Sequence, residues 1–378
     1  VRDYLLMYER IIPEVLREYD PDTFYWPASP SSGGSFDEPN DPNRGDVHYW
    51  EVWHGNKPFA EYRKYFFRYA SEFGFQSFPS VKTLETVTDD PRELNPFSYV
   101  MEKHQRNYGG NGKIAKYMQA AYRYPENFSN FVYASQLLQA DGIRYGVEHY
   151  RRNRGRCMGA IYWQLNDCWP VISWSSIDYY GRWKALHYYA KRFFAPVMLS
   201  CEEQSWMTVE ADMNRQHFEF EKSIRLNVTN ETLTAHKVLV KYAVRDASAK
   251  ILRQEEQWVE VPALSSVWMD KVELSEIDSF NEYVSYEAWE NEKIISQGTV
   301  IFSYPKYFHY QDPKLSVRVE GDEIIVSAEA YAKSVEIQNE NDDLILEDNY
   351  FDMNAGECRV KILDGKPENL KVRSVYDI

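Results

Sequence analysis

One carboxylate and one indole ring stand at the ends of two apolar segments of this chain. Glu72 lies in the segment S-E-F-G-F-Q-S-F-P (71–79), and Trp163 lies in the segment Y-W-Q-L-N-D-C-W-P (162–170). Burying a carboxylate among apolar residues costs free energy, so a chemical reason for its position is expected. Cleavage of a sugar acetal supplies one, because an anion stabilises the oxocarbenium-like transition state. A sugar's C–H face also packs on aromatic rings. We therefore predict that Glu72 is a nucleophile and that Trp163 is a sugar platform.

A second carboxylate is expected for this chemistry and is not obvious in the chain. A retaining glycosidase uses one carboxylate as nucleophile and another as acid and then base, roughly 5–5.5 Å away. No segment before Glu72 presents such a residue in a comparable setting. We therefore expect the acid/base group to be missing from these 378 residues.

Four further residues are candidate substrate contacts: His54, His48, Trp53 and Trp26. The two tryptophans fit a role in the core as well as they fit a sugar contact. His54 could donate a hydrogen bond near the nucleophile, His48 lies on the preceding predicted strand, and a structural role stays open for both. No group of His, Asp, Glu or Cys residues has metal-ligand spacing, so neither a metal nor another cofactor is expected.

The two segments, with W-S-S-I-D-Y-Y-G-R-W-K-A-L-H-Y (174–188), closely resemble the β-mannosidases of glycoside hydrolase family 2. The similarity covers roughly residues 45 to 197. It implies that Glu72 is the nucleophile and that Trp163 ends the last strand of the catalytic barrel. His54 lies where some relatives carry a tyrosine near the nucleophile, which leaves its role less certain than that of Glu72. The family's acid/base glutamate belongs to a W-x-G-N-N-E-type segment upstream, and none occurs here. The resemblance thus implies the C-terminal part of a larger enzyme.

Before Pro196 the pattern predicts strands that alternate with helices. The predicted strands are Thr23–Trp26, Asp46–Trp50, Arg68–Phe73 and Met158–Trp163. The predicted helices are Asp3–Glu18, about Phe128–Tyr150, and Trp183–Phe194. Four such units amount to half of a (β/α)8 TIM barrel, and the resemblance implies the second half, strands five to eight. Active sites of such barrels lie at the C-terminal strand ends, where Glu72 and Trp163 both fall.

After Pro196 the apolar residues alternate with period two, as Val238, Val240, Tyr242 and Val244 do. Residues 315–319 and 324–327 flank Gly321-Asp322, which predicts a β-hairpin. Short strands at regular spacing are typical of β-sandwiches, and the resemblance implies two immunoglobulin-like domains. The predicted fold is therefore α/β plus all-β, with domain boundaries at 1–196, 197–306 and 307–378.

Composition and charge limit the classes of binding partner that are expected for this chain. The net charge of −15 disfavours nucleic acid and anionic membrane surfaces, and no apolar run approaches a membrane span. Cys157 and Cys168 flank a predicted strand and are expected to be buried free thiols, which slightly favours a reducing, cytoplasmic compartment. A half barrel would leave two open strand edges, so self-association is expected.

The most economical interpretation is a fragment of a retaining exo-β-mannosidase that acts on terminal β-D-mannosyl residues of oligosaccharides. Its expected partners are a β-mannoside oligosaccharide and the missing N-terminal half of the same enzyme. Two alternatives stay open: another family 2 exo-glycosidase, such as a β-glucosaminidase or β-galactosidase, and a non-catalytic carbohydrate-binding or scaffold module.

Overall fold

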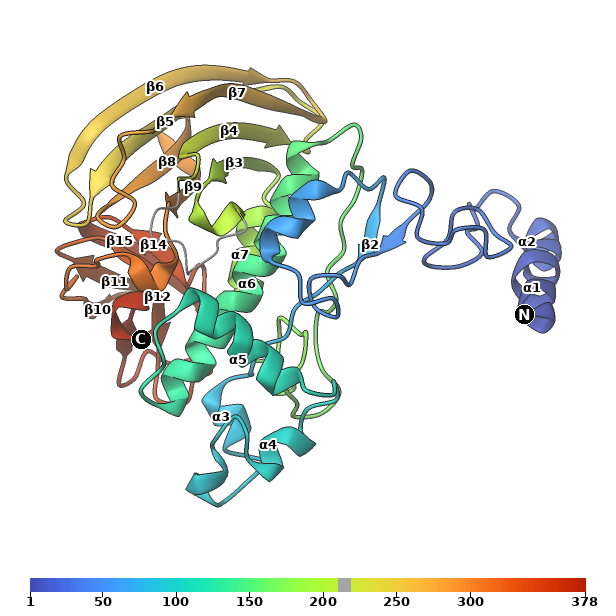
Figure 1. Cartoon of the computed structure of the whole chain (residues 1–378), viewed down its shortest axis with the longest axis horizontal. Coiled ribbons are helices and arrows are strands. Elements are labelled where there is room, and N and C mark those ends of the chain that lie inside the picture. Colours follow the sequence, from blue (N-terminus) through green and yellow to red (C-terminus); the bar gives the residue numbers. More distant parts are fainter. Residues whose placement is uncertain (210–218) are drawn as a thin grey trace.

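The computed structural model describes residues 1–209 and 219–378. Its body consists of a helical layer with a small parallel sheet and two β-sandwiches (Figure 1). The helices are α1 Arg2–Leu5, α2 Ile12–Tyr19, α3 Val81–Leu84, α4 Tyr99–Lys103, α5 Gly110–Ala121, α6 Phe128–Arg152 and α7 Ala185–Phe193. Within the described ranges, no helix has the length and apolar character needed to cross a membrane.

Three chain segments run parallel and hold the predicted site. Strand β1 (Val47–His48) pairs with β2 (Ala70–Glu72). Residues 158–163 lie along the other side of β2, where the Ile161 amide donates to the Ala70 carbonyl over 2.8 Å. The Trp163 amide likewise donates to the Phe73 carbonyl over 2.8 Å. The predicted strands 46–50 and 68–73 therefore occur as the shorter β1 and β2, whereas residues 158–163 run beside β2 with a single bridge from Ala160 to Ala70 and form no assigned strand.

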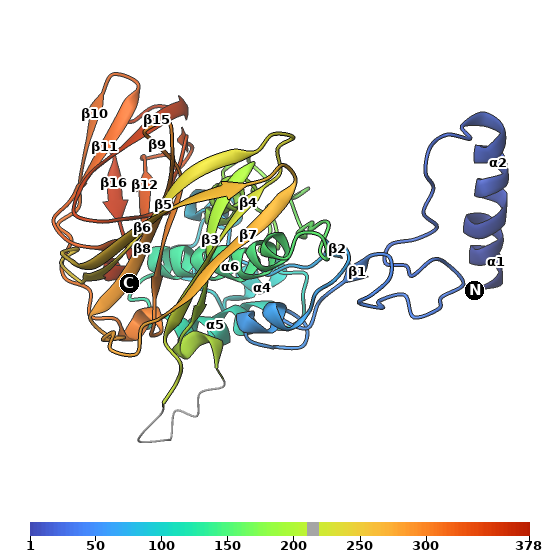
Figure 2. The ribbon, with the colours of Figure 1, turned by 90° about the horizontal axis from the view of Figure 1, so that it is seen from above.

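The prediction of a strand at Thr23–Trp26 is wrong. These residues form no strand, and side chains hold the segment instead of a backbone ladder. The Tyr25 hydroxyl donates to the Tyr8 carbonyl over 2.7 Å. The helical segment from Arg2 to Tyr19 has the predicted position, but none of its residues is buried. It stands away from the body (Figure 2). The apolar face that the sequence pattern assigns to it is thus only partly covered.

Helix α6 is the central support of the first region. The Asn127 side chain caps its start by accepting from the Asn130 amide, and most of its residues are buried. Close packing against the parallel sheet requires a glycine at position 146, since an added Cβ would lie 2.8 Å from the Phe73 ring. The close packing of Gly146 on the Phe73 ring thus fixes how near α6 lies to the strand that carries Glu72.

The remaining strands form two sandwiches, as predicted. The first packs β3-β4-β7 on β6-β5-β8-β9, and the second packs β10-β11-β15-β13 on β14-β12-β16. The strands of the first are β3 Val197–Gln204, β4 Ser223–Asn230, β5 His236–Asp246, β6 Ile251–Val261, β7 Ser265–Glu273, β8 Glu282–Glu290 and β9 Lys293–Ile301. Those of the second are β10 Ser316–Glu320, β11 Glu323–Ala328, β12 Ala332–Gln338, β13 Ile345–Leu346, β14 Phe351–Met353, β15 Gly356–Asp364 and β16 Lys371–Arg373. The predicted hairpin is confirmed, because Glu320 pairs with Glu323 across Gly321-Asp322.

The two sandwiches relate differently to the helical region. The first has a core of its own. The second shares one continuous core with α6 and α7, in which Tyr350 stacks 6.3 Å from Tyr133 and the Tyr133 hydroxyl donates to the Ser334 carbonyl. The predicted domain boundaries stay predictions, since the first and third segments bury their apolar surface together.

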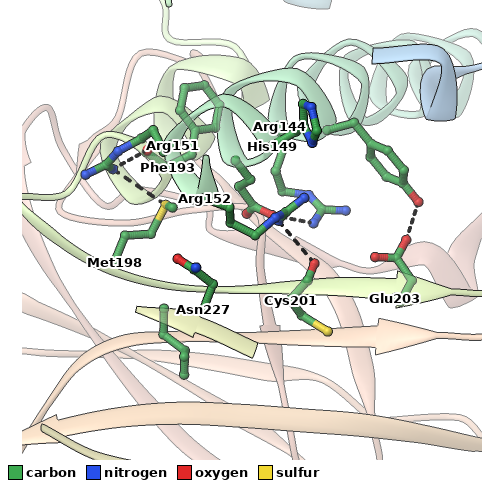
Figure 3. Close-up of polar contacts among 12 residues, drawn as sticks. Arg144, His149, Arg151, Arg152, Phe193, Met198, Cys201, Glu203 and Asn227 are labelled. Carbon is green, nitrogen blue, oxygen red and sulfur yellow. Dashed lines mark hydrogen bonds and ion pairs between the residues drawn. The ribbon is translucent and has the colours of Figure 1, made fainter. Parts of the chain in front are cut away.

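Buried polar contacts attach α6 to the first sandwich (Figure 3). Arg152 donates to the Cys201 carbonyl over 3.3 Å, and Arg151 donates to the Met198 sulfur over 3.5 Å, both on β3. The Glu203 carboxylate accepts from the Tyr145 hydroxyl and from Arg63. Because these groups are charged and buried, they hold the sandwich in one orientation on the helix that supports the sheet.

Candidate active site

Glu72 ends strand β2 and faces a histidine on the neighbouring strand. Its side chain is 20% exposed, and its Oε2 lies 3.1 Å from Nδ1 of His48. The two residues are direct partners in the register of β1 and β2. At this distance the two side chains form an ion pair when the imidazole is protonated. His48, a predicted substrate contact, thus lies directly beside Glu72.

The residues after Glu72 explain the apolar character of the motif. Phe73, Phe75 and Phe78 are completely buried. Gly74 permits close approach of the third parallel segment, because a Cβ at this position would lie 2.3 Å from the Trp163 carbonyl oxygen. The motif therefore combines one partly exposed carboxylate with residues that pack the strand beneath it.

Trp163 lies at the same edge of the sheet as Glu72. Its side chain is 45% exposed, which suits a platform better than a core position. The peptide bond between Trp163 and Gln164 is cis. The loop that follows is tied down by Asp167, which accepts from Ser173 over 2.8 Å and from the Gln164 amide over 3.2 Å. Cys168 in this loop is exposed, so its predicted burial is wrong, because the loop leaves the core after the strand ends.

A buried carboxylate that was not singled out in the sequence lies behind His48. Asp46 Oδ2 accepts from the hydroxyls of Ser29 (2.6 Å) and Ser71 (2.5 Å). Its Oδ1 accepts from the Ser31 amide (3.0 Å) and the Trp26 indole (3.1 Å). Burial raises the pKa of Asp46, but these four hydrogen bonds lower it by more, so the net shift is downward. An ionised carboxylate with four donors is a poor general acid, so Asp46 does not suit the acid/base role.

The other three predicted substrate contacts differ in how far they are buried. Trp26 is 38% exposed and is held by its bond to Asp46. His54 is exposed and packs its ring 5.2 Å from that of Trp50, and burial together with the nearby Lys113 charge lowers its pKa. Trp53 has no exposed surface. A direct sugar contact by Trp53 is therefore corrected to a packing role, since its ring is enclosed by the core.

No metal centre is present in the part of the chain that the structure describes, where no group of three His, Cys, Asp or Glu residues is placed to hold an ion.

Comparison with known proteins gives matches along nearly the whole chain. Residues 222–307 match the Mannosidase Ig/CBM-like domain, and residues 310–378 match an Ig-fold domain of mannosidases. A β-mannosidase B of Thermothelomyces thermophilus is 30% identical over 98% of this chain and 46% of its own length. The crystal structure of a β-D-mannosidase from Dictyoglomus thermophilum superposes with a TM-score of 0.84 at 28% identity, covering 98% of this chain and 44% of that one.

The chain is β-mannosidase-like. This confirms the resemblance to family 2 glycoside hydrolases that the two motifs indicated, and the two immunoglobulin-like domains with it. An exo-chitosanase of Amycolatopsis orientalis shares the fold, with a TM-score of 0.71 at 14% identity over 97% of this chain and 50% of that one. The β-mannosidase-like chain spans less than half the length of the curated relatives that it matches along nearly its whole length.

Proposed function

We propose that this chain supplies the nucleophile side of a retaining exo-β-mannosidase. The observation that carries the proposal is the juxtaposition of Glu72, His48 and the half-exposed Trp163 at one edge of a parallel sheet. We further propose that this sheet belongs to a (β/α)8 barrel that residues outside this chain complete. Those residues would include the acid/base glutamate.

The proposed reaction begins with attack of a Glu72 oxygen on the anomeric carbon of a terminal β-mannosyl residue. The leaving oxygen takes a proton from the acid group outside these residues, and water later hydrolyses the glycosyl ester. Nδ1 of His48 lies 3.1 Å from one Glu72 oxygen, and a protonated His48 would orient the other oxygen toward the sugar. Trp163 packs against the apolar face of the ring.

A second candidate is an exo-β-glucosaminidase, because the exo-chitosanase shares the fold. Identity of 28–30% to the β-mannosidases against 14% to the exo-chitosanase favours mannose. Parallel assays of the full-length polypeptide with 4-nitrophenyl β-mannoside, β-glucosaminide and β-galactoside separate the candidates. Preference for the glucosaminide or the galactoside would contradict the mannosidase assignment.

Covalent trapping tests the nucleophile in the full-length polypeptide. A 2-deoxy-2-fluoro-β-mannosyl fluoride should label the peptide that contains Glu72, because its ester is hydrolysed slowly. Glu72→Gln should nearly abolish turnover, whereas Glu51→Gln, at an exposed carboxylate beyond β1, should leave it intact. Labelling elsewhere, with Glu72→Gln still active, would refute the assignment.

Two experiments on the chain alone test whether the acid/base group is absent from it and whether its open sheet edge associates with other molecules. General acid catalysis contributes about 10²–10⁴-fold, so these 378 residues should not hydrolyse 4-nitrophenyl β-mannoside at an enzyme-like rate. The face beside Trp163 exposes Met158 and Ile161 at 50% and 52%, so self-association is expected in sedimentation velocity. Robust turnover, or a clean monomer at tens of micromolar, would contradict the respective expectation.

A further inference from the structure

A cavity of about 530 Å³ lies where the second sandwich meets the segment that leads into α7. Tyr180, Trp183 and Tyr188 line one side of it, and polar residues at the ends of sandwich strands, such as Gln338 and Asp364, line the other. The residues of the candidate active site do not line it. We propose that this cavity binds a neutral pyranose ring. The proposal does not depend on the proposed function.

The two sides of the cavity are held together before any ligand arrives. Arg182 donates to the Thr83 hydroxyl over 3.3 Å and to the Asn341 carbonyl over 3.4 Å. The Ser80 hydroxyl donates to the Asp342 carboxylate. A site that is already formed binds without the cost of ordering its walls, and its volume lies in the range of small-molecule sites.

The aromatic side offers a fixed apolar surface. The Trp183 ring lies 4.5 Å from the His187 ring and 5.3 Å from the Tyr188 ring, inclined by about 60° to both, and it stays partly exposed. Tyr180 is half exposed. The C–H face of a pyranose packs on such rings. Among the described residues, no acceptor takes the Nε1–H of Trp183, so this donor is available to a sugar hydroxyl.

The polar side offers unused hydrogen-bonding atoms. The Gln338 side chain makes no hydrogen bond to any other described residue. Asp343 accepts from the Asn339 side chain over 2.7 Å through Oδ1, and Asp364 accepts from the Gly365 amide over 2.8 Å through Oδ1. The second oxygen of each carboxylate has no donor within the described part of the chain. One amide and two carboxylate oxygens thus remain to bind hydroxyl groups.

The charges of the lining favour a neutral ligand. Asp342, Asp343 and Asp364 stand against Arg182, the one basic side chain among the described lining residues, so like charge disfavours a phosphate or a uronic acid. An acyl chain would desolvate these polar groups without giving them partners. Asp343 and Asp364 are exposed, and salt screens their attraction for an ammonium group. A neutral sugar ring satisfies both sides of the cavity.

Fluorine NMR of the chain tests the proposal at the site itself. The chain is labelled with 5-fluorotryptophan, and the Trp183 signal is assigned by its loss in Trp183→Phe. The probe is methyl α-D-mannopyranoside, which has no β linkage for the candidate active site to cleave. We expect a saturable shift of the Trp183 signal. The signal of Trp258, which is 59% exposed on β6 and lies outside the cavity, should stay in place.

Two variants on the polar side complete the test. Gln338→Ala and Asp364→Ala should each raise the sugar concentration at half saturation by about two- to tenfold, the effect of one lost hydrogen bond. Glu260→Ala, at an exposed carboxylate of β6, is the matched control and should leave it unchanged.

An unmoved Trp183 signal, or an unchanged half-saturation in both polar-side variants, would overturn the proposal. A larger Trp183 shift with methyl glucosaminide or methyl glucuronide would overturn the neutral class of ligand. A shift of the Trp163 signal without one of Trp183 would overturn this proposal and leave the proposed function standing.

Discussion

Removing the Glu203 carboxylate should break the attachment of the first sandwich to the helical region. Glu203 lies on β3 with a side chain that is 2% exposed, and Arg63 donates to it over 2.8 Å from a side chain that is 10% exposed. The Tyr145 hydroxyl donates to the same carboxylate (Figure 3). Glu203→Leu keeps the volume roughly constant but leaves the Arg63 charge buried without its partner.

The expected loss is about 3–5 kcal/mol, the usual cost of removing one member of a buried ion pair. At about 2 °C per kcal/mol for a large domain, this lowers the midpoint of thermal unfolding by about 6–10 °C. The double variant Arg63→Met/Glu203→Leu should recover most of the loss, because no charge is left unpaired. The unbonded Tyr145 hydroxyl should keep it about 1–3 kcal/mol below the unsubstituted chain.

The loss should also depend on pH. Burial raises the pKa of Glu203, but the Arg63 and Arg144 charges lower it by more, so its net shift is downward. A carboxylate with a lowered folded pKa stabilises above its unfolded pKa of about 4.3, and this stabilisation disappears as the pH falls through the folded pKa. The difference between the unsubstituted chain and Glu203→Leu should therefore be full at pH 7 and shrink below about pH 4.

The assay is thermal unfolding followed by circular dichroism at several pH values. Glu202→Leu is the matched control, since Glu202 is the neighbouring residue of β3, points to the other face and is only partly buried. It should change the stability by no more than about 0.5 kcal/mol. Equal losses for the two variants, or no coupling between Arg63 and Glu203 in the double-variant cycle, would refute the reasoning.

Three further outcomes are expected. Gly74→Ala should cost about 1–3 kcal/mol and disturb Trp163 fluorescence, because the new Cβ meets the Trp163 carbonyl, whereas Gly112→Ala in open space on α5 should stabilise by up to about 1 kcal/mol. Equal unfolding midpoints for the two variants would contradict this. One thiol, that of Cys168, should react rapidly with a disulfide reagent at pH 8, because burial raises the pKa of the other three thiols. The fast reaction should be lost in Cys168→Ser, and a second fast thiol would contradict this expectation. Burial raises the pKa of Asp342 to about 6, so its contribution to stability is present in acid and lost as the pH rises through 6. Asp342→Asn should therefore raise the unfolding midpoint at pH 7.5 and change it little at pH 4.

Local patterns in the sequence were enough to find the sandwich strands, the longest helix and the principal candidate residue. The period-two runs after Pro196 became sandwich strands, and the long amphipathic run became α6, because both signals depend only on which side chains a strand or helix turns to one face. Glu72 could be singled out because a carboxylate inside an apolar strand is unusual at any position. Its role as nucleophile stays a prediction.

Contacts between distant residues decided the rest. No pattern separates an indole in the core from one at the surface, so only packing could enclose Trp53 and expose Trp163. Residues 23–26 are strand-forming types, yet a strand needs a neighbouring segment to pair with. In the described structure no segment forms a ladder with them. Asp46 and Ser29 are 17 residues apart, and their hydrogen bond exists because the loop between them folds back onto β1. The hydrogen-bond partners of Asp46 are therefore a property of the tertiary structure.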